Sequence, residues 1–174
     1  KSFLENFWME DRGWLKDVVN GTAEEEQFRC NQVFALSMPY TMLSKEQGRR
    51  LLAAVRERLY TPVGLRTLDP ADPAFHPVYG GSQPERDRAY HQGTVWTFPL
   101  GAYYRAVLAC AEDQETAKEE IRQDLTLLEG WLTEGCLFHL AEIYDGDKPV
   151  ASRGCYAQAW SVGEIVRVYK LIEE

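Results

Sequence analysis

The fold class is decided by residues 93–111, which read Gly-Thr-Val-Trp-Thr-Phe-Pro-Leu-Gly-Ala-Tyr-Tyr-Arg-Ala-Val-Leu-Ala-Cys-Ala. Drawn as a helix, this stretch carries apolar side chains on several faces, among them Leu100, Tyr103, Tyr104 and Val107. A helix that is apolar on most sides is one that other elements cover on most sides. The stretch therefore predicts an interior helix over residues 93–111.

Helix starts of the same kind recur at nearly constant intervals along the chain. They fall near residues 31, 93 and 157, so the intervals are 62 and 64 residues. Amphipathic helices with one apolar stripe are expected between them, over residues 44–59 and 115–134. This alternation predicts an all-α fold, a partial toroid of helical hairpins in which outer helices cover buried inner ones. A plain helical bundle is the alternative, although its loops would normally be short.

Capping and helix-breaking residues set the other boundaries. Ser44 and Gln47 form a capping box that opens one amphipathic helix, and Gly135 closes the other. A loop as long as residues 61–90 is more often functional than accidental. The remaining expectations are a helix over residues 2–10 capped by Ser2, a strand or extended arm over 14–19, a solvated acidic loop over 24–26, a helix over 31–36, a loop over 135–154 and a final helix over 156–172.

Composition narrows the class of protein and of partner. The chain has 174 residues and a formal charge of −8, which fits one domain over residues 1–174 with no internal boundary. An acidic chain without a cluster of Lys and Arg argues against a nucleic-acid or membrane partner. The sequence starts without Met or a signal peptide, so we expect a domain of a longer, cytoplasmic protein.

The four cysteines are scattered, at positions 30, 110, 136 and 155, without a CxxC pair or a neighbouring pair of histidines. This spacing predicts reduced thiols and disfavours zinc binding or thioredoxin-like chemistry. We expect neither a metal ion nor an organic cofactor.

Polar side chains occupy the expected starts of all three inner helices. They are Asn31 at the first, Tyr90, His91 and Gln92 before the second, and Gln158 with Trp160 at the third. In a toroid of hairpins these starts open onto one rim. Amides hydrogen-bond hydroxyl groups and an indole packs on a sugar ring, so this rim predicts a carbohydrate site. Each group taken alone is also consistent with capping or core packing.

Two long segments carry a family signature. Residues 87–96 read Asp-Arg-Ala-Tyr-His-Gln-Gly-Thr-Val-Trp, and residues 142–147, Glu-Ile-Tyr-Asp-Gly-Asp, precede Gly-Cys-Tyr-Ala-Gln-Ala-Trp-Ser at 154–161. Together with residues 31–35, 61–66 and 79–81, they resemble the glucosidase domain of glycogen debranching enzymes, the amylo-α-1,6-glucosidases, over nearly the whole chain. The sequence departs from that pattern at Thr97-Phe98-Pro99, where relatives usually continue with Pro and a second aromatic residue.

The resemblance implies an (α/α)6 barrel, of which this chain supplies roughly the C-terminal half. It also implies hydrolysis, with inversion, of the single α-1,6-linked glucose at branch points of glycogen-like glucans. Inverting glycosidases use one carboxyl group as acid and another as base. Glu142 matches the family's general base. The family's acid is an Asp that has no counterpart here, so the chain alone is expected to be inactive.

The other expected roles concern the ligand. We expect substrate contacts from Asp87, Tyr90, His91, Gln92, Trp96, Gln158, Trp160, Asn31 and Tyr79, with Trp8 a weaker candidate. Core packing is the alternative for the two tryptophans, and pairing with Arg86 or Arg88 is the alternative for Asp87. Asp145 and Asp147 flank Gly146 and are interpreted as residues that shape their loop.

Two other functions keep the same fold. One is another (α/α)6 sugar enzyme, such as a trehalase-like hydrolase. A sugar epimerase would also keep the fold, but it would be expected to use several histidines on the rim, and only His76, His91 and His139 are present. The other is a non-catalytic glycan-binding or assembly module. Half a toroid would leave an apolar edge open, so the expected protein partner is the N-terminal remainder of the same protein or a second copy of the chain.

Overall fold

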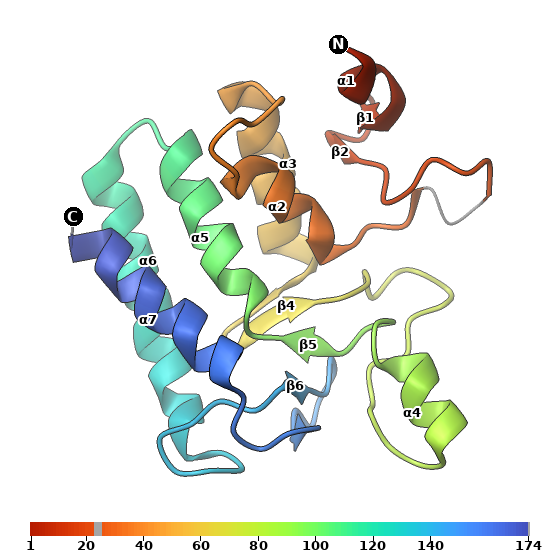
Figure 1. Cartoon of the computed structure of the whole chain (residues 1–174), viewed down its shortest axis with the longest axis vertical. Coiled ribbons are helices and arrows are strands. Elements are labelled where there is room, and N and C mark those ends of the chain that lie inside the picture. The colour runs from red at the N-terminus through yellow and green to blue at the C-terminus, as the bar shows by residue number, and fades with distance from the viewer. Residues whose placement is uncertain (23–25, 174) are drawn as a thin grey trace.

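In the computed structural model, which describes residues 1–22 and 26–173, helices make up about half of the chain and a small antiparallel sheet crosses its middle (Figure 1). Of the expected acidic loop over 24–26, Glu24 and Glu25 lie outside the described residues. Glu26 is exposed and pairs with Arg12 at 2.8 Å, as expected of a solvated carboxylate.

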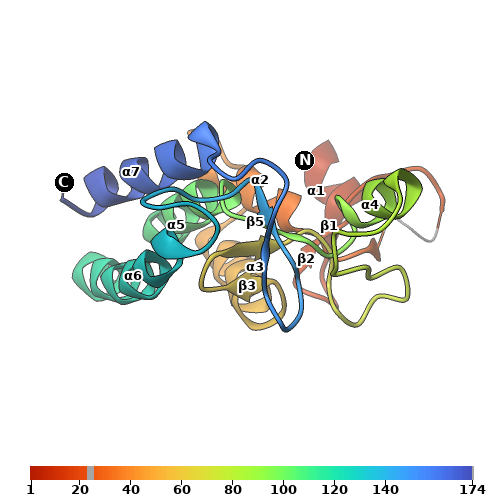
Figure 2. The ribbon, with the colours of Figure 1, turned by 90° about the horizontal axis from the view of Figure 1, so that it is seen from below.

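The helices form two layers. One holds α2 (Val33–Ser37), α5 (Pro99–Cys110) and α7 (Ala159–Glu173), and the other holds α3 (Lys45–Arg58) and α6 (Gln114–Glu129). In the view from below, α3 and α6 lie on one side of α5, and α7 lies on its other side (Figure 2). Helix α5 packs against the four other helices, which makes it the centre of the domain. This alternation agrees with the predicted helical hairpins.

The sheet overturns the prediction of a purely α fold. Its five strands run in the order β3 (Tyr60–Thr61), β4 (Gly64–Arg66), β5 (Val95–Trp96), β6 (Ile143–Tyr144) and β7 (Ser152–Arg153), and every neighbouring pair is antiparallel. Strands of two or three residues are too short to display the period-two pattern by which sequence reveals a strand. The sheet joins three segments that are far apart in sequence and holds them together beneath the helices.

The central helix begins later than predicted. Residues 95–96 pair with β4 and β6, and α5 starts only at Pro99. Proline suits the first turn of a helix because its ring presets φ and its missing N–H would be unpaired there in any case. The expected start at residue 93 is therefore wrong by six residues, and Trp96 lies in a strand.

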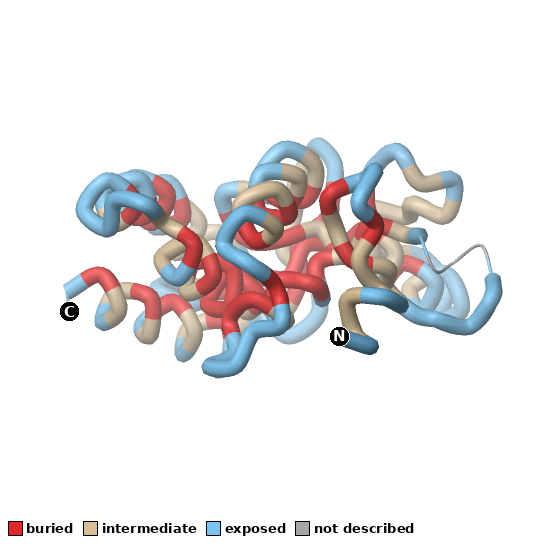
Figure 3. Tube along the Cα trace, turned by 90° about the horizontal axis from the view of Figure 1, so that it is seen from above, coloured by how far each residue is buried: buried red, intermediate tan, exposed pale blue. Residues whose placement is uncertain are grey.

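Buried segments gather in the middle of the molecule (Figure 3), and α5 contributes more of the core than any other single helix. Eight of its twelve residues are buried, which confirms the predicted interior helix. Leu51 from α3, Leu125 from α6 and Val168 from α7 pack into the same cluster. Helix α7 differs from the expectation for an inner helix, because it buries one face and leaves Val166 51% exposed.

Other boundaries divide into those set by local capping and those set by tertiary contacts. The capping box of Ser44 and Gln47 is present, and Asp113 caps α6. The predicted loop over 61–90 instead contains β4 and the short helix α4 (Gln83–Ala89), and the loop over 135–154 contains β6 and β7.

At the N-terminus, α1 (Ser2–Phe7) ends three residues early, with Lys1 and not Ser2 as its cap. The hairpin of β1 (Trp8–Met9) with β2 (Trp14–Leu15) follows it, and short 3-10 helices, η2 (Cys30–Gln32) and η3 (Gly130–Thr133), precede α2 and follow α6.

Candidate active site

A cavity of about 380 Å³ opens where the starts of α2, α5 and α7 meet the sheet. Its size lies within the range of roughly 300–1,000 Å³ that is usual for small-molecule sites. Pairing of β5 with β6 places Trp96 opposite Ile143, so Glu142 comes to lie beside the tryptophan. The residues that line the cavity are Cys30, Asn31, Thr67, Tyr90, His91, Trp96, Phe98, Pro99, Glu142, Gln158 and Trp160.

Glu142 is held at the cavity by donors from two other segments. The hydroxyl of Tyr90 donates to Oε1, and the backbone N–H of Cys155 donates to Oε2 at 2.9 Å. The backbone N–H of Glu142 in turn donates to the carbonyl of Cys155 at 2.8 Å. A carboxylate oxygen has two lone pairs, so each oxygen keeps capacity to accept a further hydrogen bond. Glu142 is therefore fixed in direction but still able to accept a proton from a bound water molecule.

Tyr90 is suited to act as the donor in this pair. Burial raises the pKa of the Tyr90 hydroxyl, and its hydrogen bond to Glu142 raises the pKa further. The phenol consequently keeps its proton at neutral pH and directs it to the carboxylate. Tyr90 follows α4 as its C-terminal cap, so this short helix positions the phenol over Glu142.

His91 presents an uncharged imidazole to the cavity at neutral pH. Burial lowers the pKa of His91, the nearby guanidinium of Arg29 lowers it further, and Glu142 opposes them. The ring stacks on Trp96, with 5.2 Å between centroids and 19° between planes. A neutral imidazole has one donor and one acceptor nitrogen, which matches the needs of a hydroxyl group.

Aromatic side chains form one wall of the cavity. Trp96 is 4% exposed, and its indole N–H donates to the carbonyl of Tyr90 at 3.1 Å. Trp160 is 46% exposed and stacks on Phe98, with 4.4 Å between centroids. Trp96 therefore supports the wall from within, and Trp160 offers an open aromatic surface for an apolar sugar face.

The structure brings seven of the ten expected site residues to this cavity: Asn31, Tyr90, His91, Trp96, Glu142, Gln158 and Trp160. The other three lie nearby or outside. Gln92 accepts a hydrogen bond from Arg29, and Tyr79 packs on Tyr90 with 5.6 Å between ring centroids. Asp87 is exposed on α4. The weaker candidate, Trp8, lies in β1 and donates to Glu10.

Asp145 and Asp147 stabilise their own segment. Asp145 is 2% exposed, pairs with Arg153 at 2.8 Å and accepts the backbone N–H of Tyr79 at 3.0 Å. Asp147 is exposed and accepts the backbone N–H of Lys148. Neither carboxylate lines the cavity, in agreement with their interpretation as residues that shape the loop.

Sequence reasoning missed Arg29 and Phe98. Arg29 donates to the carbonyl of His91 at 2.7 Å and to Oε1 of Gln92 at 2.8 Å, so it joins two of the expected binding residues. Its position just before the polar start at Asn31 was the available signal. Phe98 supports Trp160, and nothing local distinguishes it from a core aromatic.

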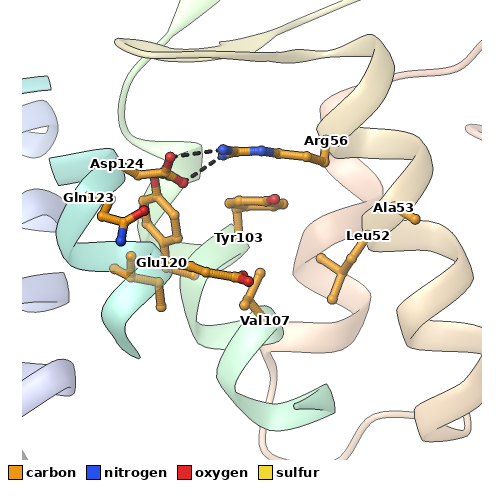
Figure 4. A pocket seen from close by; sticks show the side chains of 10 residues that line it. Leu52, Ala53, Arg56, Tyr103, Val107, Glu120, Gln123 and Asp124 are labelled. Carbon is orange, nitrogen blue, oxygen red and sulfur yellow. Dashed lines mark hydrogen bonds and ion pairs between the residues drawn. The ribbon is translucent and has the colours of Figure 1, made fainter. Parts of the chain in front are cut away.

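A larger cavity, of about 480 Å³, lies between α3, α5 and α6 (Figure 4). Its main polar groups already satisfy one another. Arg56 donates to both oxygens of Asp124, at 2.6 and 2.9 Å, and the hydroxyl of Tyr104 donates to the same carboxylate at 3.2 Å. The pair joins the outer helices across α5. It is better explained as packing between helices than as a site, and its pocket shares no residue with the one around Glu142.

Several observations bound the chemistry of the described part of the chain. It contains no group of three or more His, Cys, Asp or Glu side chains placed to hold a metal ion, and no helix long and apolar enough to cross a membrane. Cys30 and Cys110 are buried free thiols, Cys136 is half-buried and Cys155 is exposed. Among the described residues that line the cavity, Glu142 supplies the carboxyl group.

A family model and a curated relative that match the chain agree with each other. A family model described as amylo-alpha-1,6-glucosidase matches residues 1–167. The chain is also similar to a protein of Saccharomyces cerevisiae (strain ATCC 204508 / S288c) named glycogen debranching enzyme, with 29% identity over 171 residues. The match covers 86% of this chain but spans only 11% of the length of the yeast protein.

Proposed function

This chain belongs to the amylo-alpha-1,6-glucosidase family, and from that premise we propose that its cavity is part of a glycosidase active site with Glu142 as the general base. The observation that carries the proposal is that hydrogen bonds from Tyr90 and Cys155 orient the Glu142 carboxylate beside an aromatic wall of the cavity. A fixed carboxylate can act as the general base of sugar hydrolysis, and neighbouring amides and indoles can bind the sugar.

The proposed reaction removes a single α-1,6-linked glucose at a branch point of a glycogen-like glucan. Glu142 takes a proton from water as the water oxygen attacks the anomeric carbon. The bond from that carbon to the glucan oxygen breaks on the opposite face, and the general acid protonates this leaving oxygen. The product therefore has the inverted configuration. Meanwhile His91 and Gln158 would hold the glucose hydroxyls, and Trp160 would pack on the ring.

The general acid is expected from residues outside positions 1–174. The two carboxyl groups of an inverting glycosidase stand roughly 6.5–9.5 Å apart. Among the described residues that line the cavity, Glu142 is the one with a carboxyl group. The proposed activity therefore belongs to the full-length protein, in a cytoplasmic setting, and requires the rest of its chain as partner. We expect the isolated chain not to release glucose from a branched glucan.

Replacement of Glu142 by Gln in the full-length protein tests the base. The amide keeps the size of the side chain but cannot accept the proton, and loss of general base catalysis typically lowers kcat by about 10²–10⁴-fold. Asp147→Asn is a matched control, because Asp147 is exposed in the same segment and lines no part of the cavity. Hydrolysis by Glu142→Gln at a near-normal rate with unaltered binding would show that the assignment is wrong.

A non-catalytic glycan-binding module is the second candidate, because the cavity offers one carboxyl group and ample hydrogen-bonding capacity. A full-length protein that binds branched oligosaccharides but releases no glucose would favour it. Another (α/α)6 sugar hydrolase would be recognised by its substrate. Release of glucose from a trehalose-like disaccharide, without action on α-1,6 branches, would favour that function.

The apolar residues left open on α2 and α7 suggest where a protein partner docks. Phe34 in α2 and Met38 directly after it are exposed by 38% and 60%, and Val166 in α7 by 51%. In the full-length protein, further helices would cover them. In the isolated chain we expect self-association, and sedimentation as a stable, well-folded monomer would contradict this.

A further inference from the structure

A second cavity adjoins the one that holds Glu142. Its volume is about 310 Å³, and Asn31 and His91 line both cavities. The additional lining residues are Asp17, Val18, Asn20, Gln27, Arg29 and Gln92. Except for Val18, all of these side chains are polar or charged.

Arg29 organises this second cavity without offering a free charge to a ligand. Its Nη2 donates to Oε1 of Gln27 at 2.7 Å and to Oε1 of Gln92 at 2.8 Å, while Nη1 donates to the carbonyl of His91. Nη1 also lies 3.5 Å from the carbonyl of Thr67, and Nε pairs with Asp17 at 3.4 Å. Both terminal nitrogens of the guanidinium are thus directed at acceptors of the protein, and its charge is paired with Asp17.

This arrangement favours a neutral, hydroxyl-rich ligand. Because Asp17 balances the charge of Arg29, the cavity carries no excess of positive charge that would attract an anion. Both glutamines turn Oε1 toward Arg29, which leaves the amide nitrogen of Gln92 without a partner among the described residues. Asp17 contributes acceptor oxygens. Donors and acceptors side by side are what sugar hydroxyls require.

The position relative to Glu142 assigns the side of the scissile bond. In an inverting reaction the base and its water stand on the face of the glucose opposite the leaving oxygen. The leaving chain must therefore lie away from Glu142. The second cavity fits, because it continues past Asn31 and His91 and Glu142 does not line it.

We propose that Asp17, Gln27 and Gln92 form a subsite for the α-glucan chain on the leaving side of the scissile bond. The inference rests on the proposed function, since it takes Glu142 as the base. This subsite makes the active site selective for a glucose that is attached to a longer chain, compared with a glucose that carries a small leaving group.

The test compares two substrates of the full-length protein. One is a branched maltooligosaccharide that ends in a single α-1,6-linked glucose, which would fill both cavities. The other is α-D-glucosyl fluoride, whose leaving group is one atom. The measured quantity is the ratio of kcat/KM for the oligosaccharide to kcat/KM for the fluoride, since this ratio isolates contacts to the leaving chain.

We expect Asp17→Asn and Gln27→Ala each to lower this ratio about tenfold, mainly through KM for the oligosaccharide, as loss of one hydrogen bond to a charged or amide group would do. Asp11→Asn is the matched control: the Asp11 side chain is 82% exposed and lines neither cavity. Unchanged ratios in both variants, or an equal fall with Asp11→Asn, would overturn the subsite. Competition by inorganic phosphate would also overturn it, because it would identify an anion site. A Glu142→Gln protein that hydrolyses both substrates normally would instead refute the proposed function.

Discussion

Glu142 and Cys155 hold each other through two hydrogen bonds, one from each backbone N–H. The N–H of Cys155 donates to Oε2 of the Glu142 side chain at 2.9 Å, and the N–H of Glu142 donates to the carbonyl of Cys155 at 2.8 Å. The segment after β7 is thereby fastened to the residue before β6. The direction of the proposed base thus depends on a backbone conformation thirteen residues away in sequence.

Gly154 is the residue that allows this conformation, and we expect Gly154→Ala to impair activity. Its φ is +65°, and a Cβ there would lie 2.4 Å from Oε2 of Glu142. The substitution should displace the carboxylate and lower kcat of the full-length protein by at least tenfold. It should also cost about 1–2 kcal/mol of stability, because a left-handed backbone is unfavourable for alanine. Steady-state kinetics and urea unfolding measure the two effects.

Gly163→Ala is the matched control. Gly163 lies in α7, and apart from its chain neighbours and the backbone of its own helix no atom lies within 4 Å of where its Cβ would be. Alanine in the interior of a helix should increase stability by up to about 1 kcal/mol. If Gly154→Ala keeps wild-type kcat, the backbone around Cys155 does not control the base.

We expect His91 to make the free energy of unfolding of the protein decrease as the pH falls. Burial and Arg29 lower the pKa of His91 in the folded state below its value in the unfolded chain, which is about 6.5. The folded state then binds fewer protons than the unfolded state. The contribution is therefore fully present above the unfolded pKa and is lost as the pH falls from that value through the lower pKa of the folded state. Because the ring is partly exposed, the effect should be modest.

Urea unfolding at pH 7.5 and pH 5.5 tests this effect in the wild type and in His91→Gln. The loss of stability between the two pH values should be smaller in the variant, since glutamine does not titrate. His139→Gln is a suitable control because His139 is exposed. An identical loss in wild type and His91→Gln would exclude His91 as the source.

The four cysteines should differ sharply in their reaction with iodoacetamide. The attacking species is the thiolate, and burial raises the pKa of Cys30 to about 12, so its thiol stays protonated at pH 8. Cys155 is exposed. Peptide mass spectrometry after brief alkylation should find Cys155 modified, and Cys30 and Cys110 modified only in denaturant. Rapid alkylation of Cys30 in the folded protein would contradict its burial beside the cavity.

Local signals account for what the sequence could predict of the fold. The capping box at Ser44 and the apolar faces of α5 depend on residues within a few positions of one another, and the structure has both features. The predicted stop at Gly135 is not where α6 ends, because the α-helix stops at Glu129 and continues as the 3-10 helix η3. The sheet depends on pairing between distant segments, such as Leu65 with Trp96 and Val95 with Tyr144. Trp96 and its neighbours suit a buried helix as well as a buried strand, so only those partners could decide between them.

The candidate site divides in the same way. Asn31, Tyr90 and Glu142 stand at the starts of elements or in long motifs, and the cavity unites them. Arg29 was missed because its importance lies in its partners, His91 and Gln92, which are more than sixty positions away. No spacing rule on a single sequence relates an arginine to acceptors at that distance.

The ion pair between Arg56 and Asp124 should stabilise the fold without affecting the site. Asp124 is 7% exposed and accepts from Arg56 and Tyr104, whereas the Arg56 side chain is 47% exposed (Figure 4). Removal of one partner from a fully buried pair costs 3–5 kcal/mol. Because Arg56 reaches solvent, we expect about 1–3 kcal/mol for Asp124→Asn, with kcat/KM unchanged. Glu115→Gln, which breaks the pair with Lys118 on the surface of α6, should cost under about 1 kcal/mol, because the Glu115 side chain is 77% exposed. Equal losses in both variants would mean that the pair between the outer helices contributes no more than a surface contact.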